Sequence, residues 1–301
     1  MDSLFGPEGV LARSIDGYEF RAGQLEMARA VAQCLAPTEE EPKEGCSSLV
    51  VEAETGLGKT LAYLIPAVLS GARVVVSTNT RNLQDQILEK EIPLIREHID
   101  PHLQALCVKG RQNYLCLYRF RQLQAASAGE LFAEGGETLD HWIAETVYAD
   151  RSELPWLAAS SLLWQKICCQ SHFCLGPSCP EATGCFLNRL RRDAGASRLL
   201  IVNHHLLFSD LAVRRTGYGE VLPRYETVIF DEAHHVENVA TTFFGFTLSR
   251  YQMLDLVGDL ERTVAEDLAG KDRQEVSEAA VRLSGTVERW TATFPSGRGR
   301  F

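Results

Sequence analysis

Apolar positions recur along the chain in two patterns, one typical of helices and one typical of buried strands. Residues 22–35 carry apolar side chains at helical spacing, which predicts an amphipathic helix. Four short runs rich in Val, Leu and Ile suit strands that are buried on both faces of a parallel sheet. These runs are LVVEA at 49–53, RVVVST at 73–78, LLIVN at 199–203 and TVIFDE at 227–232. Helical stretches at about 59–70 and 80–98 separate the first of them, so the pattern predicts βαβ alternation and an α/β fold.

The α/β pattern is interrupted between the second and third runs by about 90 residues without a comparable strand pattern. This segment holds most of the cysteines, and we interpret it as an insertion into the α/β domain. Beyond residue 240 the pattern becomes helical with mixed charges, which indicates the start of a second inserted domain. The predicted parts are 1–109 and 191–240 for the α/β domain, 110–190 for the first insertion and 241–301 for the helical domain.

Net charge limits how this chain would bind nucleic acid. A net charge of −10 argues against binding through an overall positive field, so contacts would have to be local. Two basic clusters are candidates, although each is also compatible with a solvated charged surface. They are Lys109, Arg111, Arg119 and Arg121, and Arg189, Arg191, Arg192 and Arg198.

The N-terminal sequence and the distribution of apolar residues bear on location. The start, MDSLFGPEGVLARS, lacks a basic segment followed by an apolar signal core. No stretch approaches the roughly 18 apolar residues needed to cross a bilayer. We therefore expect a cytoplasmic protein without a membrane partner, whose nine cysteines are buried thiols or metal ligands instead of disulfides.

A glycine-bearing turn after the first apolar run matches the Walker A pattern. It reads AETGLGKT, with Ala53 where the first glycine usually stands. Gly56 and Gly58 let the backbone curl so that successive N–H groups face a phosphate, and the helix that follows adds its positive dipole end. Lys59 would reach the β- and γ-phosphates, and the Thr60 hydroxyl would ligate Mg²⁺.

The partner motif is VIFDEAHH, in which an apolar strand ends in Asp231 and Glu232. These carboxylates would lie at the carboxyl edge of the sheet, beside the phosphate loop. We expect Asp231 to hold Mg²⁺ through water, and Glu232 to orient and deprotonate the attacking water. A solvated acidic turn would explain the tetrapeptide alone, but the two motifs together predict hydrolysis of a nucleoside triphosphate.

These motifs resemble those of superfamily 2 helicases. The tetrapeptide DEAH is the DEAH box of that superfamily. The segment FRAGQ resembles the one by which such enzymes contact the adenine of ATP, which implies base recognition by Gln24. The segment STNTRNLQ resembles their motif Ia, which implies contacts of Thr78, Arg81 and Gln84 with single-stranded DNA. Small hydroxyl and amide donors bind phosphates without net positive charge, which reconciles DNA binding with the acidic composition.

Four cysteines are spaced as ligands of a metal centre. Cys174, Cys179 and Cys185 are separated by four and then five residues, and Cys116 stands upstream. Four thiolates ligate either an iron–sulfur cluster or a tetrahedral zinc ion. One distant cysteine with a widely spaced triple favours the cluster. The other cysteines are Cys168 and Cys169, which are close enough to substitute as ligands, Cys34 and Cys107, expected to be core thiols, and Cys46, expected in a loop.

The order of these features resembles the iron–sulfur helicases related to XPD, and most closely their bacterial DinG-like branch. In that family an inserted module carries one cysteine after a KGR-type segment and three more before the next core strand. The segment ASRLLIVNHHLLF also matches, which implies that Asn203 and His204 lie near the DNA path. The resemblance implies a RecA-like P-loop motor domain, interrupted by a [4Fe-4S] module and followed by the start of an arch-like helical domain.

The function implied by this resemblance is that of an ATP-dependent DNA helicase that moves 5′-to-3′ on single-stranded DNA and opens forked DNA in repair or replication. The cluster module would act as a wedge, rigid because the metal replaces a core too small to hold it. The second motor domain is absent from these 301 residues, so we expect a fragment or a truncated gene product. The alternatives are an RNA-directed DEAH enzyme, which the cysteine module disfavours, and an ATP- or redox-sensing module that never translocates.

Overall fold

The computed structural model describes residues 1–36, 47–54, 56–126, 136–217, 219–246, 249–267 and 270–293. Cys46, which was predicted to be a loop residue, lies outside these ranges. The chain divides into two compact units, Met1–Phe243 and Phe244–Phe301. All the predicted site residues lie in the first unit.

Helices surround the sheet of the first unit, and several begin where the sequence predicts them. Ala22–Leu35 (α3) and Lys59–Leu69 (α4) match two predicted helices. The helix predicted at 80–98 consists of α5 (Arg81–Gln86), a π-helical turn η1 (Ile87–Glu91) and α6 (Ile92–His98). The other helices up to residue 244 are α1 (Asp2–Phe5), α2 (Val10–Ser14), α7 (Leu117–Ala126), α8 (Gly136–Glu145), α9 (Leu162–Ile167), α10 (Phe186–Ala196), α11 (His204–Thr216) and α12 (Val236–Phe244). Short 3₁₀ turns are η2 (Arg111–Asn113), η3 (Arg151–Glu153), η4 (Ser171–Phe173), η5 (Gly176–Ser178) and η6 (Ala233–His235).

Four parallel strands form one sheet in the order β2-β3-β1-β4. They are β1 (Val74–Thr78), β2 (Ala105–Cys107), β3 (Leu199–Asn203) and β4 (Thr227–Phe230). In the central strand, Val74 pairs with Leu199 on one side and with Thr227 on the other. Every residue of β1 is buried, as expected for a β-branched strand that is covered on both faces. The predicted α/β fold with a parallel sheet is therefore confirmed.

The strand predicted at 49–53 is wrong. These residues form no strand before the phosphate loop, and the side chain of Val50 is 94% exposed. In the part of the chain that the structure describes, β4 is therefore an edge strand, and its residues are only partly covered. An apolar composition favours burial, but it does not determine whether a run finds a pairing partner at the edge of a sheet.

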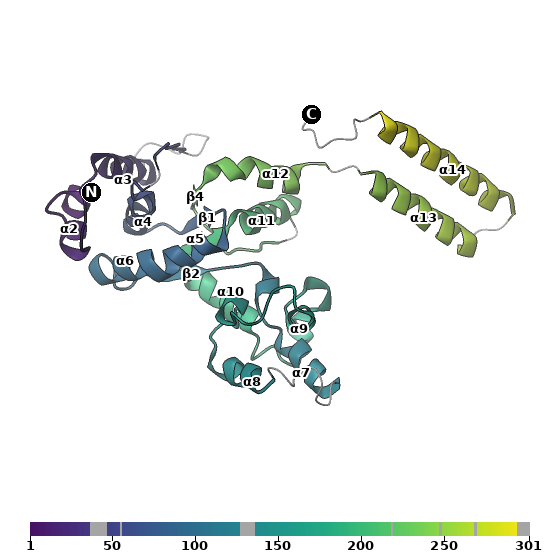
Figure 1. The fold of residues 1–301 in the computed structure, drawn as a ribbon, viewed down its shortest axis with the longest axis horizontal. Coiled ribbons are helices and arrows are strands. Elements are labelled where there is room, and N and C mark those ends of the chain that lie inside the picture. Colours follow the sequence, from purple (N-terminus) through teal and green to yellow (C-terminus); the bar gives the residue numbers. More distant parts are fainter. Residues whose placement is uncertain are drawn as a thin grey trace. The chain divides into compact units, whose positions relative to one another are not determined.

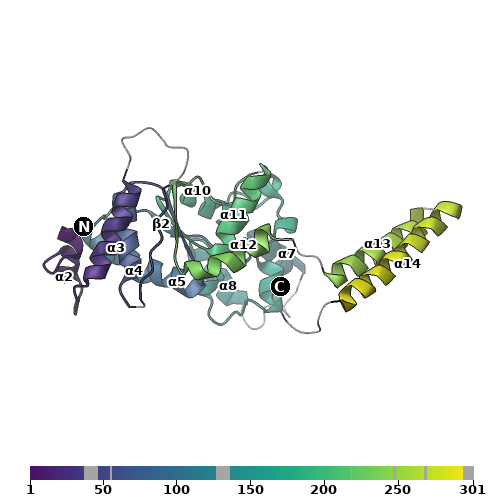
Figure 2. The same ribbon diagram turned by 90° about the horizontal axis from the view of Figure 1, so that it is seen from above.

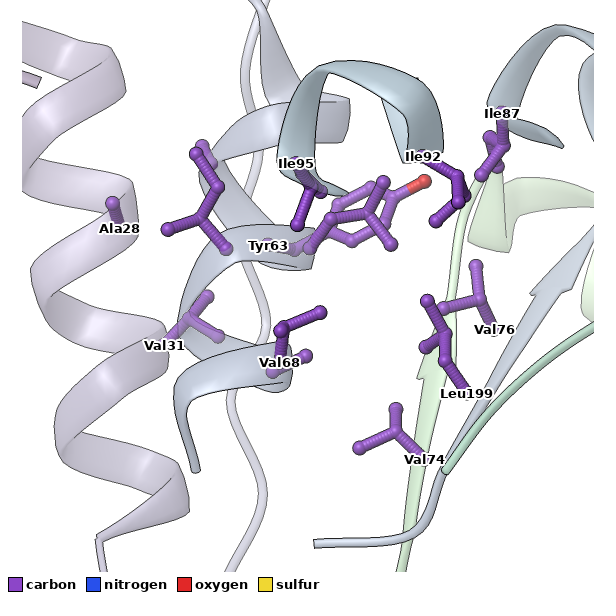
Figure 3. Packing of buried hydrophobic residues seen from close by; sticks show 14 of the residues in the cluster. Ala28, Val31, Tyr63, Val68, Val74, Val76, Ile87, Ile92, Ile95 and Leu199 are labelled. Atoms are coloured by element: carbon purple, nitrogen blue, oxygen red, sulfur yellow. The ribbon is translucent and has the colours of Figure 1, made fainter. Parts of the chain in front are cut away.

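Apolar side chains pack on both faces of the sheet, with α3 and α4 on one side and α10 and α11 on the other (Figures 1 and 2). Val74 and Val76 of β1 share an apolar cluster with α4, η1 and α6, and α3 covers the other side of α4, whereas Val75 faces α10 and α11. Figure 3 shows the first cluster, in which Tyr63 of α4 points away from α3. Since α5 and α11 begin directly after β1 and β3, their N-termini meet at the carboxyl edge of the sheet, where ligands bind in open α/β sheets.

The segment between β2 and β3 has a hydrophobic core of its own. Its buried side chains include Phe120 of α7, Trp164 of α9 and Phe186 of α10. Two isolated bridges, Tyr114 to Asp150 and Leu115 to Cys168, tie its distant parts together. The expectation that a metal replaces a core too small to hold this segment is therefore corrected, because packed aromatic side chains hold it.

In the second unit, the described residues form two helices, α13 (Arg250–Asp267) and α14 (Gly270–Ala292), which pack against each other. This agrees with the helical pattern of the sequence beyond residue 240. Across the described ranges of the whole chain, no helix has the length and apolar character required to span a membrane.

Candidate functional site

The phosphate loop turns on two glycines in the left-handed conformation. Gly56 and Gly58 both have a φ of +84°, which residues with a Cβ rarely adopt. Glycine is also required at position 58 for steric reasons, because a Cβ there would lie 2.2 Å from Nε2 of Gln24. Gly58 is also the N-cap of α4, so the N-terminal N–H groups and the dipole of an 11-residue helix face the turn. This local geometry suits an anion.

Three side chains hold the loop through its own carbonyl groups. Gln24 Nε2 donates to the Gly58 carbonyl at 3.0 Å, and Lys59 Nζ donates to the Ala53 carbonyl at 3.0 Å. Arg21 donates to the Gly56 carbonyl. Gln24 therefore orders the phosphate loop here, and its contact with adenine stays a prediction. The role of Arg21 was missed, although it stands within the FRAGQ segment that drew attention to Gln24.

The two carboxylates follow β4, as the sequence predicts. The Asp231 N–H donates to the Ser77 carbonyl of β1 at 2.8 Å, which anchors the acidic turn to the neighbouring strand. Glu232 has a φ of +55°, an uncommon conformation for a residue other than glycine. Backbone of this kind is enriched at functional sites, although Ala149 adopts the same φ outside this one. Oε2 of Glu232 lies 3.4 Å from Nδ1 of His234, so the His234 imidazole can hold this carboxylate in place.

Tyr63 connects the acidic turn to the helix of the phosphate loop. Its hydroxyl donates to Oδ2 of Asp231 at 3.0 Å, and it stands one helical turn after Lys59 on α4. Burial raises the pKa of Asp231, while the Tyr63 hydrogen bond and the positive charge of Lys59 act in the opposite direction. The structure thus joins the aspartate of the second motif to α4, the helix that begins at Lys59. The sequence analysis did not predict a role for Tyr63. The one feature that could have indicated it is the spacing of four residues from Lys59, which places both on the same face of a helix.

A buried polar pair lies at the adjacent strand ends. Ser77 Oγ of β1 and Nδ1 of His204, the first residue of α11, are 2.7 Å apart, and both side chains are fully buried. Burial lowers the pKa of His204, which favours the neutral imidazole. Asn203 caps α11, since its Oδ1 accepts a hydrogen bond from the Leu206 N–H at 2.8 Å. These contacts fix the geometry of the carboxyl edge.

Three of the five predicted DNA contacts are interior residues. Thr78, Gln84 and His204 have 0% exposed surface, so their side chains cannot touch a DNA strand in this conformation. The prediction that they contact DNA is corrected on this ground. Arg81 and Asn203 do line an open groove. The motif resemblance pointed to residues at the carboxyl edge of the sheet but did not separate buried side chains from those that line the groove.

The groove has a volume of about 1340 Å³ and lies between the carboxyl edge of the sheet and the cysteine-bearing segment. Arg81, Asn203 and His205 line it from the sheet side, and Arg111, Arg151, His172 and Arg191 line it from the other side. Among its described lining residues, Glu220 is the one carboxylate, and it already pairs with Arg214 at 3.1 Å. A chain with a net charge of −10 thus presents a locally basic groove.

Most members of the two basic clusters have intramolecular partners. Lys109 forms ion pairs with Asp85 and Asp150 and is 7% exposed. The remaining pairings are Arg119 with the Cys168 and Gln165 carbonyls, Arg121 with Glu181, Arg189 with the Val147 carbonyl, Arg192 with Asp193 and Arg198 with Asp100. Arg111 and Arg191 are the two that line the groove with no such partner in the described residues. Basic clusters read from sequence therefore overstate the charge available to a ligand.

Comparisons with known proteins agree with this geometry. The DEAD/DEAH box helicase family matches residues 30–126. The chain is 37% identical to the ATP-dependent DNA helicase YoaA of Escherichia coli, over 96% of this chain and 44% of YoaA. It is 34% identical to the ATP-dependent helicase DinG of Mycobacterium tuberculosis, over 74% of this chain and 35% of that protein. The chain belongs to the DEAD/DEAH box helicases, in their DinG-like branch.

A further relative is named for a different activity. The chain is 34% identical to the 3′-5′ exonuclease DinG of Bacillus subtilis, over 80% of this chain and 25% of that protein. The DinG-like chain described here spans less than half the length of each of these three relatives. Its phosphate loop lies within the matched family segment, whereas its DEAH box and the cysteines from Cys168 onward lie beyond it.

The predicted metal ligands of this DinG-like chain lie at the ends of short helices. The Cys116 carbonyl accepts a hydrogen bond from the Phe120 N–H at the start of α7, and Cys185 is the N-cap of α10. Cys174 and Cys179 directly follow the turns η4 and η5. A hydrogen bond from the Cys169 thiol lowers the pKa of Cys116 to about 6. The same bond, together with burial, raises the pKa of Cys169.

The donor set fits a thiolate-bound cluster only in part. Cys116 and Cys185 pack against the same apolar cluster as Cys169, whereas Cys174 is exposed. In the described ranges, no three His, Cys, Asp or Glu side chains are arranged as a metal ion requires. The [4Fe-4S] cluster and its ligand set therefore stay predictions. Cys169, considered from the sequence as a substitute ligand, is the thiol that lowers the pKa of Cys116, and its Sγ also donates to the Leu115 carbonyl at 3.3 Å.

Proposed function

We propose that this chain supplies the ATP-binding part of a DNA helicase, which couples ATP hydrolysis to movement along single-stranded DNA and to duplex unwinding. The observation that carries the proposal is the 3.0 Å hydrogen bond from Tyr63 to Asp231, because it joins the DEAH turn to the phosphate-loop helix. By family resemblance we further propose 5′-to-3′ movement, forked DNA as a substrate, a role in repair or replication, and a cytoplasmic location.

In the proposed ATP site each residue has a separate task. The N–H groups of the turn at Gly56 and Gly58 bind phosphate oxygens. When ATP binds, the Lys59 ammonium leaves the Ala53 carbonyl and contacts the β- and γ-phosphates. Thr60 and Asp231 would hold Mg²⁺, which supplies charge neutralisation to the transferred phosphate. Glu232 orients the attacking water and takes its proton.

The basic groove is the proposed path of the DNA strand. Arg81, Arg111 and Arg191 supply cationic donors to phosphates, and Asn203 adds an amide at the strand end. Its position at the carboxyl edge of the sheet places bound DNA next to the elements that also carry the ATP motifs. Movement of those elements during hydrolysis would therefore act directly on the strand.

The cysteine segment is proposed to hold a [4Fe-4S] cluster through Cys116, Cys174, Cys179 and Cys185, with zinc as the alternative metal. A bound cluster would cross-link η4, η5 and the starts of α7 and α10. Iron and acid-labile sulfide analysis of anaerobically purified protein tests this proposal. Cys179→Ser is expected to remove the visible absorbance of the cluster, whereas the remote Cys34→Ser should retain it. Zinc without sulfide in fresh protein would contradict the cluster.

The ATP proposal is tested by titrating the chain with a fluorescent ATP analogue. Lys59→Ala removes a charged donor to the phosphates, so binding should weaken by about tenfold or more. Lys166→Ala removes an exposed lysine from the cysteine segment and serves as the control. Wild-type affinity in Lys59→Ala would refute the assigned phosphate site.

The choice of nucleic acid is tested through ATP hydrolysis by the complete protein. Single-stranded DNA should stimulate hydrolysis if the strand and the nucleotide share a motor. Stimulation by RNA alone would support an RNA-directed DEAH enzyme. Hydrolysis that responds to neither polymer would support an ATP- or redox-sensing module and would sink the helicase proposal.

A further inference from the structure

Lys109 is a buried cation at the junction between the sheet and the cysteine segment. It follows β2 and is 7% exposed, although it sits among residues that line the basic groove. Its backbone N–H donates to the Tyr114 hydroxyl at 2.8 Å, so the main chain at this point is also held. A lysine is rarely buried to this extent unless it is paired.

The ammonium group of Lys109 contacts both sides of the junction. Nζ lies 3.1 Å from Oδ1 of Asp85 and 3.0 Å from Oδ2 of Asp150, and it donates to Ser152 Oγ at 3.2 Å. Asp85 belongs to α5, which follows β1 of the sheet, whereas Asp150 and Ser152 belong to the cysteine segment. One side chain therefore joins two parts of the molecule that are 65 residues apart in sequence (Asp85 to Asp150).

Both carboxylates are close in the chain to cations of the groove. Asp85 stands one helical turn after Arg81 on α5, and Asp150 directly precedes Arg151. Asp150 is also the N-cap of η3, where its side chain accepts a hydrogen bond from the Ser152 N–H at 2.9 Å. The bridge made by Lys109 thus joins the segments that carry Arg81 and Arg151, and the Arg151 side chain also donates to the Leu157 carbonyl at 3.1 Å.

The two carboxylates around Lys109 keep its ammonium group charged and paired, so that it acts as a structural bridge. Burial alone would lower the pKa of Lys109, but Asp150 and Asp85 raise it above its ordinary value, so the group stays charged. Because a buried ion pair that loses one partner leaves an uncompensated charge, each member of the bridge is needed by the others.

We propose that Lys109 is a positioning residue that ties α5 to the 150–153 turn and thereby sets the spacing of Arg81 and Arg151 across the groove. The proposal rests on the proposed DNA function of that groove. It assigns Lys109 an effect on single-stranded DNA binding without contact between its ammonium group and the DNA. A direct phosphate contact by Lys109 is the competing explanation.

Substitution of the acidic partners separates these explanations. Asp150→Asn and Asp85→Asn keep side-chain size and remove a negative charge near the groove, and each removes one of the two ion pairs of Lys109. If Lys109 positions the two sides, both variants should bind labelled oligo(dT) about three- to tenfold more weakly, although the chain becomes less acidic. Tighter binding by these variants would show that Lys109 contacts phosphate, and would overturn the proposal. Asp16→Asn, an exposed aspartate in the N-terminal part, is the charge-matched control.

The salt dependence of binding gives a second discrimination. Lys109→Met keeps the length of the side chain and should weaken binding while leaving the slope of log K against log salt unchanged. A lost phosphate contact would instead lower the magnitude of that slope by about 0.7, the value for single strands. A decrease of that size would contradict the positioning role. If Lys109→Met fails to fold, Asp150→Asn carries the same expectation.

Hydrogen exchange tests the bridge without DNA. Amides of α5 and of the 150–153 turn should exchange faster in Lys109→Met and Asp150→Asn than in the wild type, because local opening becomes easier when the bridge is lost. Unchanged exchange in both segments would overturn the bridge. If the variants exchange faster but the wild-type protein does not bind DNA, the structural role of Lys109 is supported. The proposed DNA-binding function of the groove is then refuted.

Discussion

The hydroxyl of Tyr63 holds Asp231 in one orientation before any metal arrives. At the residue scale this is the contact that links the two ATP motifs, and it depends on a single oxygen atom. The ring itself packs in the cluster of Figure 3 and would remain in place in a phenylalanine variant. The hydroxyl can therefore be removed with little loss of apolar packing.

We predict that Tyr63→Phe raises the Mg²⁺ concentration needed for half-maximal binding of an ATP analogue. The physical reason is that an unrestrained Asp231 must be ordered when the metal binds. The free energy of unfolding should fall by about 1 kcal/mol, the size of one hydrogen bond. Tyr148→Phe removes a comparable hydroxyl that donates to Asp193 at 3.1 Å, and it should leave the Mg²⁺ midpoint unchanged. An unchanged midpoint in Tyr63→Phe would refute the role of the hydroxyl.

A second prediction concerns the thiol chemistry of Cys116 in metal-free protein. Because the hydrogen bond from Cys169 lowers the pKa of Cys116, this thiol should ionise at a lower pH than an ordinary cysteine. The midpoint pH of its alkylation by iodoacetamide should therefore lie below the ordinary thiol pKa of about 8.5. Cys169→Ala removes the hydrogen bond and should shift this midpoint upward, whereas Cys34→Ala should not. Mass spectrometry of the Cys116 peptide measures the rate, and equal midpoints in all three proteins would contradict the expectation.

At the scale of helices and strands, the sequence predicts best where a periodic pattern and burial agree. The runs at 74–78 and 199–203 became central strands because their Val, Leu and Ile side chains face helices on both sides. The run at 49–53 has a similar composition but no strand partner in the described residues. Pairing is a non-local property, so composition does not specify it.

The same limit applies to the motif residues on these elements. Gly56, Gly58, Lys59, Asp231 and Glu232 could be predicted, because their chemistry demands particular residue types at fixed spacing. Tyr63 and Arg21 could not be, since their contacts arise from helix register and from a turn that brings distant segments together. Gln84 and His204 share motifs with outward-facing residues, yet both point inward. The sequence motifs do not indicate which of their side chains point into the core and which reach the surface.

At the scale of the whole molecule, charge is distributed very unevenly. Acidic residues outnumber basic ones by ten, yet the groove between the sheet and the cysteine segment is lined mainly by cations and histidines. Among the described residues, most arginines outside the groove have carbonyl or carboxylate partners, as Arg119, Arg189 and Arg214 do. The negative net charge therefore predicts weak non-specific attraction to nucleic acid. The groove, in contrast, is a local, positively charged site.

Neighbouring arginines on α10 allow this distribution to be tested. Arg191 lines the groove, whereas Arg192 pairs with Asp193 at 3.0 Å and does not line it. Each phosphate contact contributes about 0.9 to the slope of log K against log salt on duplex DNA and about 0.7 on single strands. We predict that Arg191→Ala weakens oligo(dT) binding and lowers the slope by about 0.7, and that Arg192→Ala changes neither. Fluorescence anisotropy over a salt series gives both quantities. Because the two substitutions change the net charge equally, equal losses would mean that overall charge governs binding, and the groove would no longer account for it.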